Sequence, residues 1–255
     1  MKRALKITLI ILIIFTFVDC RGRKNDKTQE QQAEVGSAGM VRIHAGVSKM
    51  GSDSGTELEA PEKLVTTEEY WIDKFEYPNI LGEMPLVNVT WYEAREKCLE
   101  QGKDLPTERQ WEKACRGPEG FVYPYGNEYD KRKCRTDLSW GDGPAVSGSY
   151  RDCVSGYGVY DMSGNVMEWT LGESVEERAV RGGFWQNIDF YTSCSYRVFY
   201  HPTYAAPNIG FRCVKSSGKI GKVPVPEFQK TTTYWARLKR IIEEGSSITP
   251  TDFLK

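Results

Sequence analysis

Apolar and polar residues alternate in two stretches of the first third of the chain. Residues 40–46 and 70–76 place apolar side chains at about every second position. A period of two is typical of a strand with one buried face. We therefore expect a strand in each stretch. The acidic segment between them, which contains Glu57, Glu59 and Glu62, is expected to be a solvated loop.

Two helices are predicted by capping boxes. Thr90 stands three residues before Glu93, and Thr107 stands three residues before Gln110. In a capping box each side chain satisfies a backbone N–H of the other residue at the start of a helix. A glycine follows each predicted helix and would end it. The residues expected on the buried helix faces are Trp91, Ala94, Cys98 and Leu99, then Trp111, Ala114 and Cys115.

Two further strands are expected near the end of the patterned region, at residues 180–185 and 209–214. Each contains an arginine, Arg181 or Arg212, among apolar residues and glycines. These arginines could be buried partners of carboxylates, or could be half-exposed and only stack. Between the helices and these strands, residues 116–158 show no lasting periodicity. We expect this region to be ordered by disulfides, aromatic packing or a bound ion.

The N-terminus has the pattern of an export signal. Lys2 and Arg3 precede an apolar run, residues 4–18, that is short for a membrane span. The run ends just before Cys20, and residues 1–20 resemble a bacterial lipoprotein signal with a relaxed cleavage box. We expect cleavage before Cys20 and lipid attachment to its thiol; an uncleaved N-terminal anchor is the alternative. Both place the protein in the bacterial cell envelope, outside the cytoplasm and attached to a membrane.

Composition separates the rest of the chain into three parts. Residues 21–39 are polar and are expected to form a flexible tether. Residues 40–215 carry the folded domain, and residues 216–255 form a tail with a short amphipathic helix at 234–244. The chain has 255 residues and a net charge of −1. The absence of a basic excess argues against nucleic acid as a partner.

Six cysteines remain if Cys20 is lipidated, which is an even number in an exported chain. Six cysteines allow fifteen pairings, so the connectivity is a hypothesis. A helix face and a closing strand should meet in the core, and one pair should clip the irregular region. The pairs we favour are Cys98 with Cys213, Cys134 with Cys153, and Cys115 with Cys194.

The segment 158–169 is the strongest candidate for a metal site. It is rich in glycine and carries two carboxylates, Asp161 and Glu168, seven residues apart. Both could converge on one calcium ion, with the carbonyls of Gly164 and Val166 as further oxygen ligands. The alternative is a surface turn with solvated acids. No zinc-binding His-Glu-x-x-His, nucleophile elbow or phosphate-binding loop occurs in the chain.

Several short motifs follow one another in a recognisable order. They are residues 50–51, 72–76, 85–91, 105–108, 111–117, 157–169, 181–183 and 208–212. Their order resembles the formylglycine-generating enzyme family, also called the sulfatase-modifying factor domain. The resemblance implies a single α+β domain with little regular secondary structure, related to C-type lectin folds. It also implies calcium as a structural cofactor, held by Asp161, Gly164, Val166 and Glu168.

The same resemblance implies copper chemistry that this sequence does not match. The family's oxidase holds copper with two cysteine thiolates and converts a sulfatase cysteine to formylglycine. Asn187 stands where the first cysteine is expected, and only Cys194 could match the second. Phe184 and Met167 also replace a serine and a tryptophan of the family pattern.

We therefore expect an exported lipoprotein that uses this domain as a binding or scaffold module for an unknown protein or glycan ligand, without oxidase activity and with no catalytic residue. The alternative is a copper-dependent oxidase of the formylglycine type, or another enzyme of the family, in which Cys194 would be catalytic. The number of free thiols separates the two hypotheses.

Overall fold

The computed structural model describes residues 39–55, 58–59, 61–172 and 176–216. Four expected features lie outside the described residues and stay predictions: the signal peptide, lipidation at Cys20, the tether over residues 21–38, and the tail helix at 234–244. Within the described ranges, no helix is long and apolar enough to cross a membrane.

The two expected helices are present, and both begin at the predicted capping boxes. They are α2 (Trp91–Glu100) and α3 (Glu108–Arg116). One residue of α2 was assigned to the wrong face. Leu99 is 42% exposed, whereas Arg95 is buried, because Arg95 pairs with Asp104 and lies over the Trp91 ring. The buried face of α2 is therefore turned towards this ion pair.

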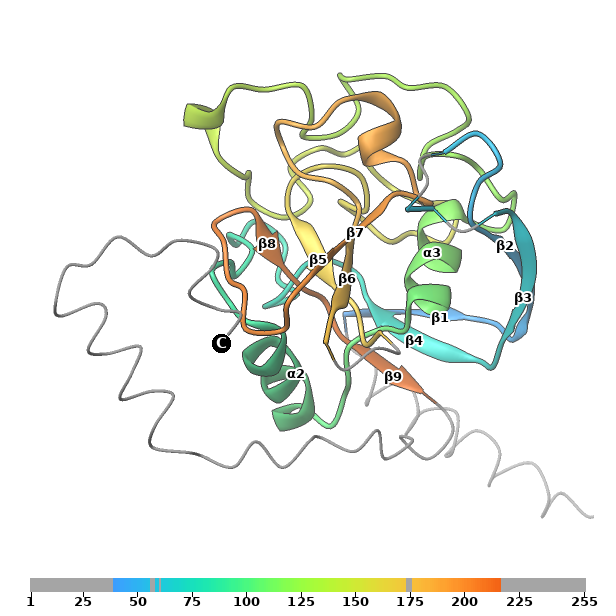
Figure 1. Cartoon of the computed structure of the whole chain (residues 1–255), viewed down its shortest axis with the longest axis horizontal. Coiled ribbons are helices and arrows are strands. Elements are labelled where there is room, and N and C mark those ends of the chain that lie inside the picture. The colour runs from blue at the N-terminus through green and yellow to red at the C-terminus, as the bar shows by residue number, and fades with distance from the viewer. Residues whose placement is uncertain (1–38, 56–57, 60, 173–175, 217–255) are drawn as a thin grey trace, which may run out of the picture. The chain divides into compact units, whose positions relative to one another are not determined.

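A three-stranded antiparallel sheet collects the two ends of the described chain (Figure 1). Its central strand β4 (Tyr70–Asp73) pairs with β1 (Met40–Ile43) on one side and with β9 (Val214–Ser216) on the other. Met40 lies opposite Asp73, and Tyr70 lies opposite Ser216. The expected strands in residues 40–46 and 70–76 thus pair with each other.

A separate two-stranded ladder joins β2 (Gly46–Met50) to β3 (Lys63–Thr67). The acidic segment between these two strands was expected to be a solvated loop, and this was wrong for one residue. Glu59 is only 5% exposed, and its carboxylate accepts a hydrogen bond from the Ser195 hydroxyl at 3.3 Å. A distant partner therefore draws Glu59 into the interior.

A four-stranded sheet has the order β7-β6-β5-β8. Its strands are β5 (Met167–Trp169), β6 (Arg178–Arg181), β7 (Arg197–Tyr200) and β8 (Ile209–Gly210). The β5–β8 pair is parallel, and the other pairs are antiparallel. The strand expected at 180–185 ends at Arg181, and the one expected at 209–214 is split between β8 and the start of β9 in the other sheet. Strand β5 lies between β6 and β8 (Figure 1), so Glu168 is on an inner strand of the four-stranded sheet.

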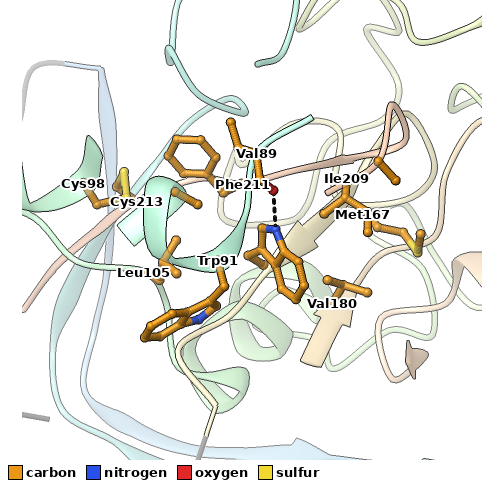
Figure 2. Packing of buried hydrophobic residues seen from close by; sticks show 12 residues of the cluster. Val89, Trp91, Cys98, Leu105, Met167, Val180, Ile209, Phe211 and Cys213 are labelled. Atoms are coloured by element: carbon orange, nitrogen blue, oxygen red, sulfur yellow. Dashed lines mark hydrogen bonds between the residues drawn. A yellow bond between two sulfur atoms is a disulfide. The ribbon is translucent and has the colours of Figure 1, made fainter. Parts of the chain in front are cut away.

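The interior consists of two hydrophobic clusters. One packs α2 against the four-stranded sheet and contains Trp91, Trp169 and Phe211; Trp169 donates a hydrogen bond to the Val89 carbonyl at 3.0 Å (Figure 2). The other packs α3 against β4 and contains Trp111 and Ile72. The 3₁₀ turns η1 (Trp140–Asp142) and η2 (Asp189–Thr192) lie in the irregular part.

Three disulfides fasten these parts together, and they are the three pairs favoured from the sequence. Cys98 bonds to Cys213 in the first cluster, and Cys115 bonds to Cys194 in the second. The third pair, Cys134 with Cys153, closes a loop within the irregular region. All six cysteines in the described part of the chain are therefore in disulfides.

Candidate functional site

The candidate calcium ligand Glu168 is buried in β5 and is bound by hydrogen-bond donors on both oxygens. Its Oε2 accepts from Trp111 Nε1 at 2.8 Å and from Arg212 Nε at 2.7 Å, and its Oε1 accepts from Arg212 Nη2 at 2.7 Å. The two-point pairing of a guanidinium with a carboxylate is among the stronger polar contacts in proteins. Glu168 therefore has a cationic partner supplied by the chain itself.

Two further buried carboxylates, Asp161 and Glu76, lie close enough to feel the charge of Arg212. Asp161 Oδ2 accepts from the Gly148 amide at 2.6 Å, and burial raises the pKa of Asp161 to about 6. Glu76 accepts from Asn165 and from Ser147, at 2.8 and 2.9 Å. Burial raises the pKa of Glu76 well above its usual value, and the charge of Asp161 raises it further.

Gly164 fixes the shape of the loop between these carboxylates. Its φ of 75° lies in the left-handed region, and an added Cβ would come within 2.3 Å of the Arg135 carbonyl oxygen. Only glycine fits such an approach. The loop 161–168 is thereby pressed against residues 135–136.

The side chains in and around this loop fit a hard cation by charge. Glu76, Asp161 and Glu168 carry three buried carboxylates, and Arg212 supplies one guanidinium against them. They do not fit a metal held by side chains alone, because no three His, Cys, Asp or Glu side chains of the described chain converge on one point. A calcium ion here would need backbone carbonyls as ligands. Asp161 would be its side-chain ligand, because Glu168 is already paired with Arg212.

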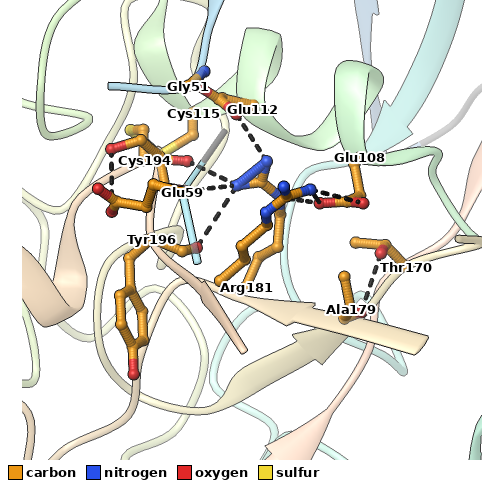
Figure 3. Close-up of polar contacts among 12 residues, drawn as sticks. Gly51, Glu59, Glu108, Glu112, Cys115, Thr170, Ala179, Arg181, Cys194 and Tyr196 are labelled. Atoms are coloured by element: carbon orange, nitrogen blue, oxygen red, sulfur yellow. Dashed lines mark hydrogen bonds and ion pairs between the residues drawn. A yellow bond between two sulfur atoms is a disulfide. The ribbon is translucent and has the colours of Figure 1, made fainter. Parts of the chain in front are cut away.

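The second candidate site, around Cys194, contains no thiol pair. Cys194 is completely buried and its sulfur is bonded to Cys115 at 2.02 Å (Figure 3). Asn187, where the first copper cysteine was expected, uses its side-chain oxygen to accept from the Phe184 amide at 3.0 Å. Neither position offers the free thiolates that soft copper(I) requires.

Arg181 holds the segment around this disulfide in place (Figure 3). It donates to Glu112 at 2.6 Å and to the carbonyls of Cys194 and Ser195 at 3.2 and 3.0 Å. Glu112 is itself buried and also accepts from Arg116 at 2.8 Å. Arg181, the first residue of the motif at 181–183, therefore forms a structural ion pair with Glu112.

Sequence reasoning did not identify the acids that complete these networks. Glu76 and Glu112 lie within the motifs 72–76 and 111–117, but nothing local in either motif indicates that the acid is buried. A buried arginine could have indicated Glu112, because Arg181 requires a carboxylate partner and α3 supplies it. Glu76 instead accepts from Asn165 and Ser147, so no arginine indicated it.

Large apolar side chains lie exposed between positions 187 and 194, where the oxidase's copper ligands were expected. Ile188, Phe190 and Tyr191, at or beside η2, are 47%, 40% and 39% exposed. Exposed apolar groups gathered in one place are typical of binding surfaces. We call these three residues the η2 surface.

The fold is the α+β class with little regular secondary structure that the sequence predicts, and it is shared with solved structures. PvdO from Pseudomonas aeruginosa is 20% identical and superposes with a TM-score of 0.59, covering 69% of this chain and 94% of that protein. Residues 77–217 match the family model described as "Sulfatase-modifying factor enzyme 1-like domain". The chain belongs to this family, as the motifs indicated.

Two curated relatives bear opposite names. "Inactive C-alpha-formylglycine-generating enzyme 2" of Bos taurus is 35% identical in an alignment 159 positions long, which covers 54% of this chain and 52% of the relative. "Formylglycine-generating enzyme" of Mus musculus is 31% identical in an alignment 161 positions long, which covers 51% of this chain and 43% of the relative. The chain thus spans about half the length of each. Similarity alone does not assign the activity, so the site must.

Proposed function

We propose that this chain is an exported, lipid-anchored protein of the bacterial cell envelope whose sulfatase-modifying factor domain is a binding or scaffold module without oxidase activity. The Cys115–Cys194 disulfide is the observation that carries the proposal. A copper oxidase of the formylglycine type needs two thiolates, but the sulfur of Cys194 is in a buried disulfide with Cys115. The similarity to a relative named inactive supports the same conclusion.

A copper and oxidation assay tests the catalytic half of this proposal. The full chain, purified without reductant, is titrated with copper(I) and incubated with a sulfatase-derived cysteine peptide. We expect no tight copper binding and no formylglycine in the peptide. The variant Cys115→Ser, which leaves Cys194 as a lone thiol, should also be inactive. Tight copper binding with peptide oxidation by the wild type would contradict the proposal.

The binding half of the proposal assigns contact with a partner to the η2 surface. A photo-crosslinking residue at position 190 should give one defined adduct in the producing cell. The matched control carries the same residue at position 47, because Val47 in β2 is also apolar and is 63% exposed. Equal labelling from both positions would show that exposure alone explains the adduct.

The lipid anchor is a separate part of the proposal, supported by the signal-like sequence before Cys20. Cells fed a labelled fatty acid should label the wild-type chain. The variant Cys20→Ser should lose that label and leave the membrane fraction. A labelled Cys20→Ser chain would contradict attachment at this thiol.

Calcium completes the proposed module as a structural ion. Asp161 and the carbonyls of Gly164 and Val166 would hold it. Glu168 would contribute to the charge balance together with Arg212. When bound, the ion would neutralise the excess of buried carboxylates in this region.

A further inference from the structure

A cavity of about 770 Å³ lies in the irregular region and is formed by one continuous loop, residues 125–133. Its volume falls in the range of small-molecule sites in proteins, about 300–1,000 Å³. None of the residues in the calcium loop or around Cys194 lines it. The cavity therefore needs an explanation of its own.

The loop is firmly held at both ends. At its start, the Tyr123 hydroxyl donates to Asp189 at 2.7 Å, and the Tyr125 ring stacks on Tyr123 with centroids 5.6 Å apart. At its end, Cys134 is bonded to Cys153. A loop braced in this way keeps its concave shape, so a ligand would enter a preformed site.

Tyrosines and internal ion pairs build the walls. Tyr125 and Tyr129 both line the cavity, and the Tyr129 hydroxyl hydrogen-bonds to Thr136 at 3.0 Å. Most charges along the loop are already paired. Arg132 is bound to Asp130 at 2.7 Å, and Lys131 is bound to Asp137 at 2.9 Å.

Lys133 is the exception among the cationic side chains of this loop. Its ammonium lies 5.1 Å from the centre of the Tyr125 ring, and it has no carboxylate partner among the described residues. Contact with an aromatic face holds a cation in place but leaves its hydrogen-bond donors available. Glu128 is exposed and has no ion-pair partner among the described residues, whereas Lys133 is half-buried.

We propose that this cavity binds a carboxylated saccharide. The carboxylate would pair with the Lys133 ammonium, and the sugar ring would lie against the tyrosine wall. The hydroxyl groups would meet the polar rim, which includes the Asn127 amide. A flat apolar ligand would leave that rim without partners. The site goes beyond the proposed partner contact at the η2 surface and does not depend on it.

The test uses a matched pair of sugars and a matched pair of lysines. The full chain in nonionic detergent is titrated calorimetrically with cellobiouronic acid and with cellobiose, which differ by the carboxylate. We expect the acid to bind and Lys133→Gln to weaken it about tenfold, the effect of losing one charge-assisted hydrogen bond. Lys131→Gln should change the affinity less than about twofold, because Asp137 already neutralises Lys131.

Several results would overturn the proposal. These are no binding of the acid, equal affinity for the two sugars, or equal losses in the two lysine variants. Inorganic phosphate that binds as tightly as the sugar acid would show a general anion site. Unchanged melting temperatures in both variants, measured in parallel, confirm that each remains folded. A negative result here leaves the copper and crosslinking assays unaffected.

Discussion

Glu168 accepts hydrogen bonds from Trp111 in α3 and from Arg212, which lies between β8 and β9. The two contacts join segments 57 and 44 residues away in the sequence. Neither the Glu168 carboxylate nor the Arg212 guanidinium is accessible to water. Removing one partner of such a pair leaves the other charge buried without compensation, which costs more than the pair itself contributes.

We therefore expect Glu168→Ala to lower the free energy of unfolding by about 3–5 kcal/mol, both in calcium and in chelator. Urea unfolding in the two buffers measures this. The control is Glu62→Gln, which breaks the surface pair with Lys49 and should shift the midpoint little. A loss that appears only in calcium would mean that Glu168 acts as a metal ligand rather than as the partner of Arg212.

Whether Arg181 and Arg212 are buried ion-pair partners or half-exposed could not be decided from the sequence. A pattern of apolar residues and glycine shows that an arginine is near the core. It does not show which carboxylate meets it, because Glu112 is 69 residues from Arg181 and Glu168 is 44 residues from Arg212. Such partners are fixed only by the tertiary fold.

At the scale of elements, local signals predicted the helices well. The capping boxes at Thr90 and Thr107 act within four residues, so both helix starts could be read from the sequence. Strand β5 was missed because its three residues are all buried and show no alternation. The burial of Glu59 was not predicted either, because its partner Ser195 is remote in the sequence.

The loop 161–168 gives a direct test of calcium. A ligand that binds only the folded state stabilises it by RT ln(1 + [L]/Kd), about 2.7 kcal/mol at 100 times Kd. The wild-type melting temperature should rise with calcium, and Asp161→Asn should lose most of that rise. An equal rise in both proteins, or none in the wild type, would remove calcium from this loop.

Acid titration of the same loop gives a second prediction. In chelator, the Asp161 pKa is about 6 in the folded state and about 3.9 in the unfolded chain. The folded state therefore binds more protons between these values, so stability is lost as pH rises through about 6. We expect a gain of about 1 kcal/mol in the free energy of unfolding from pH 7 to pH 5.

The burial-raised pKa of Glu76 acts in the same direction. Calcium should reverse the slope, because protons then displace the ion from Asp161. Denaturant unfolding across pH 5–7, with Asp161→Asn as the control, distinguishes the two cases. A stability in chelator that falls on acidification would contradict the buried, metal-free carboxylates.

At the scale of the whole molecule, cysteines connect what secondary structure does not. The six cysteines other than Cys20, and the helix faces that carry Cys98 and Cys115, were enough to suggest the pairs. The course of residues 116–158 could not be predicted, since its order comes from the Cys134–Cys153 bond and from irregular hydrogen bonds. The cavity in residues 125–133 belongs to this region and had no sequence signal.

A thiol count tests most directly whether the family's two-sulfur site is absent. The full-length Cys20→Ser variant, purified without reductant, is denatured and treated with an alkylating reagent, and its mass is measured. We expect no alkylated cysteine before reduction and six after it, since six of the seven cysteines remain in this variant. Two alkylated cysteines before reduction, one of them Cys194, would contradict a domain that has lost the sulfurs for copper.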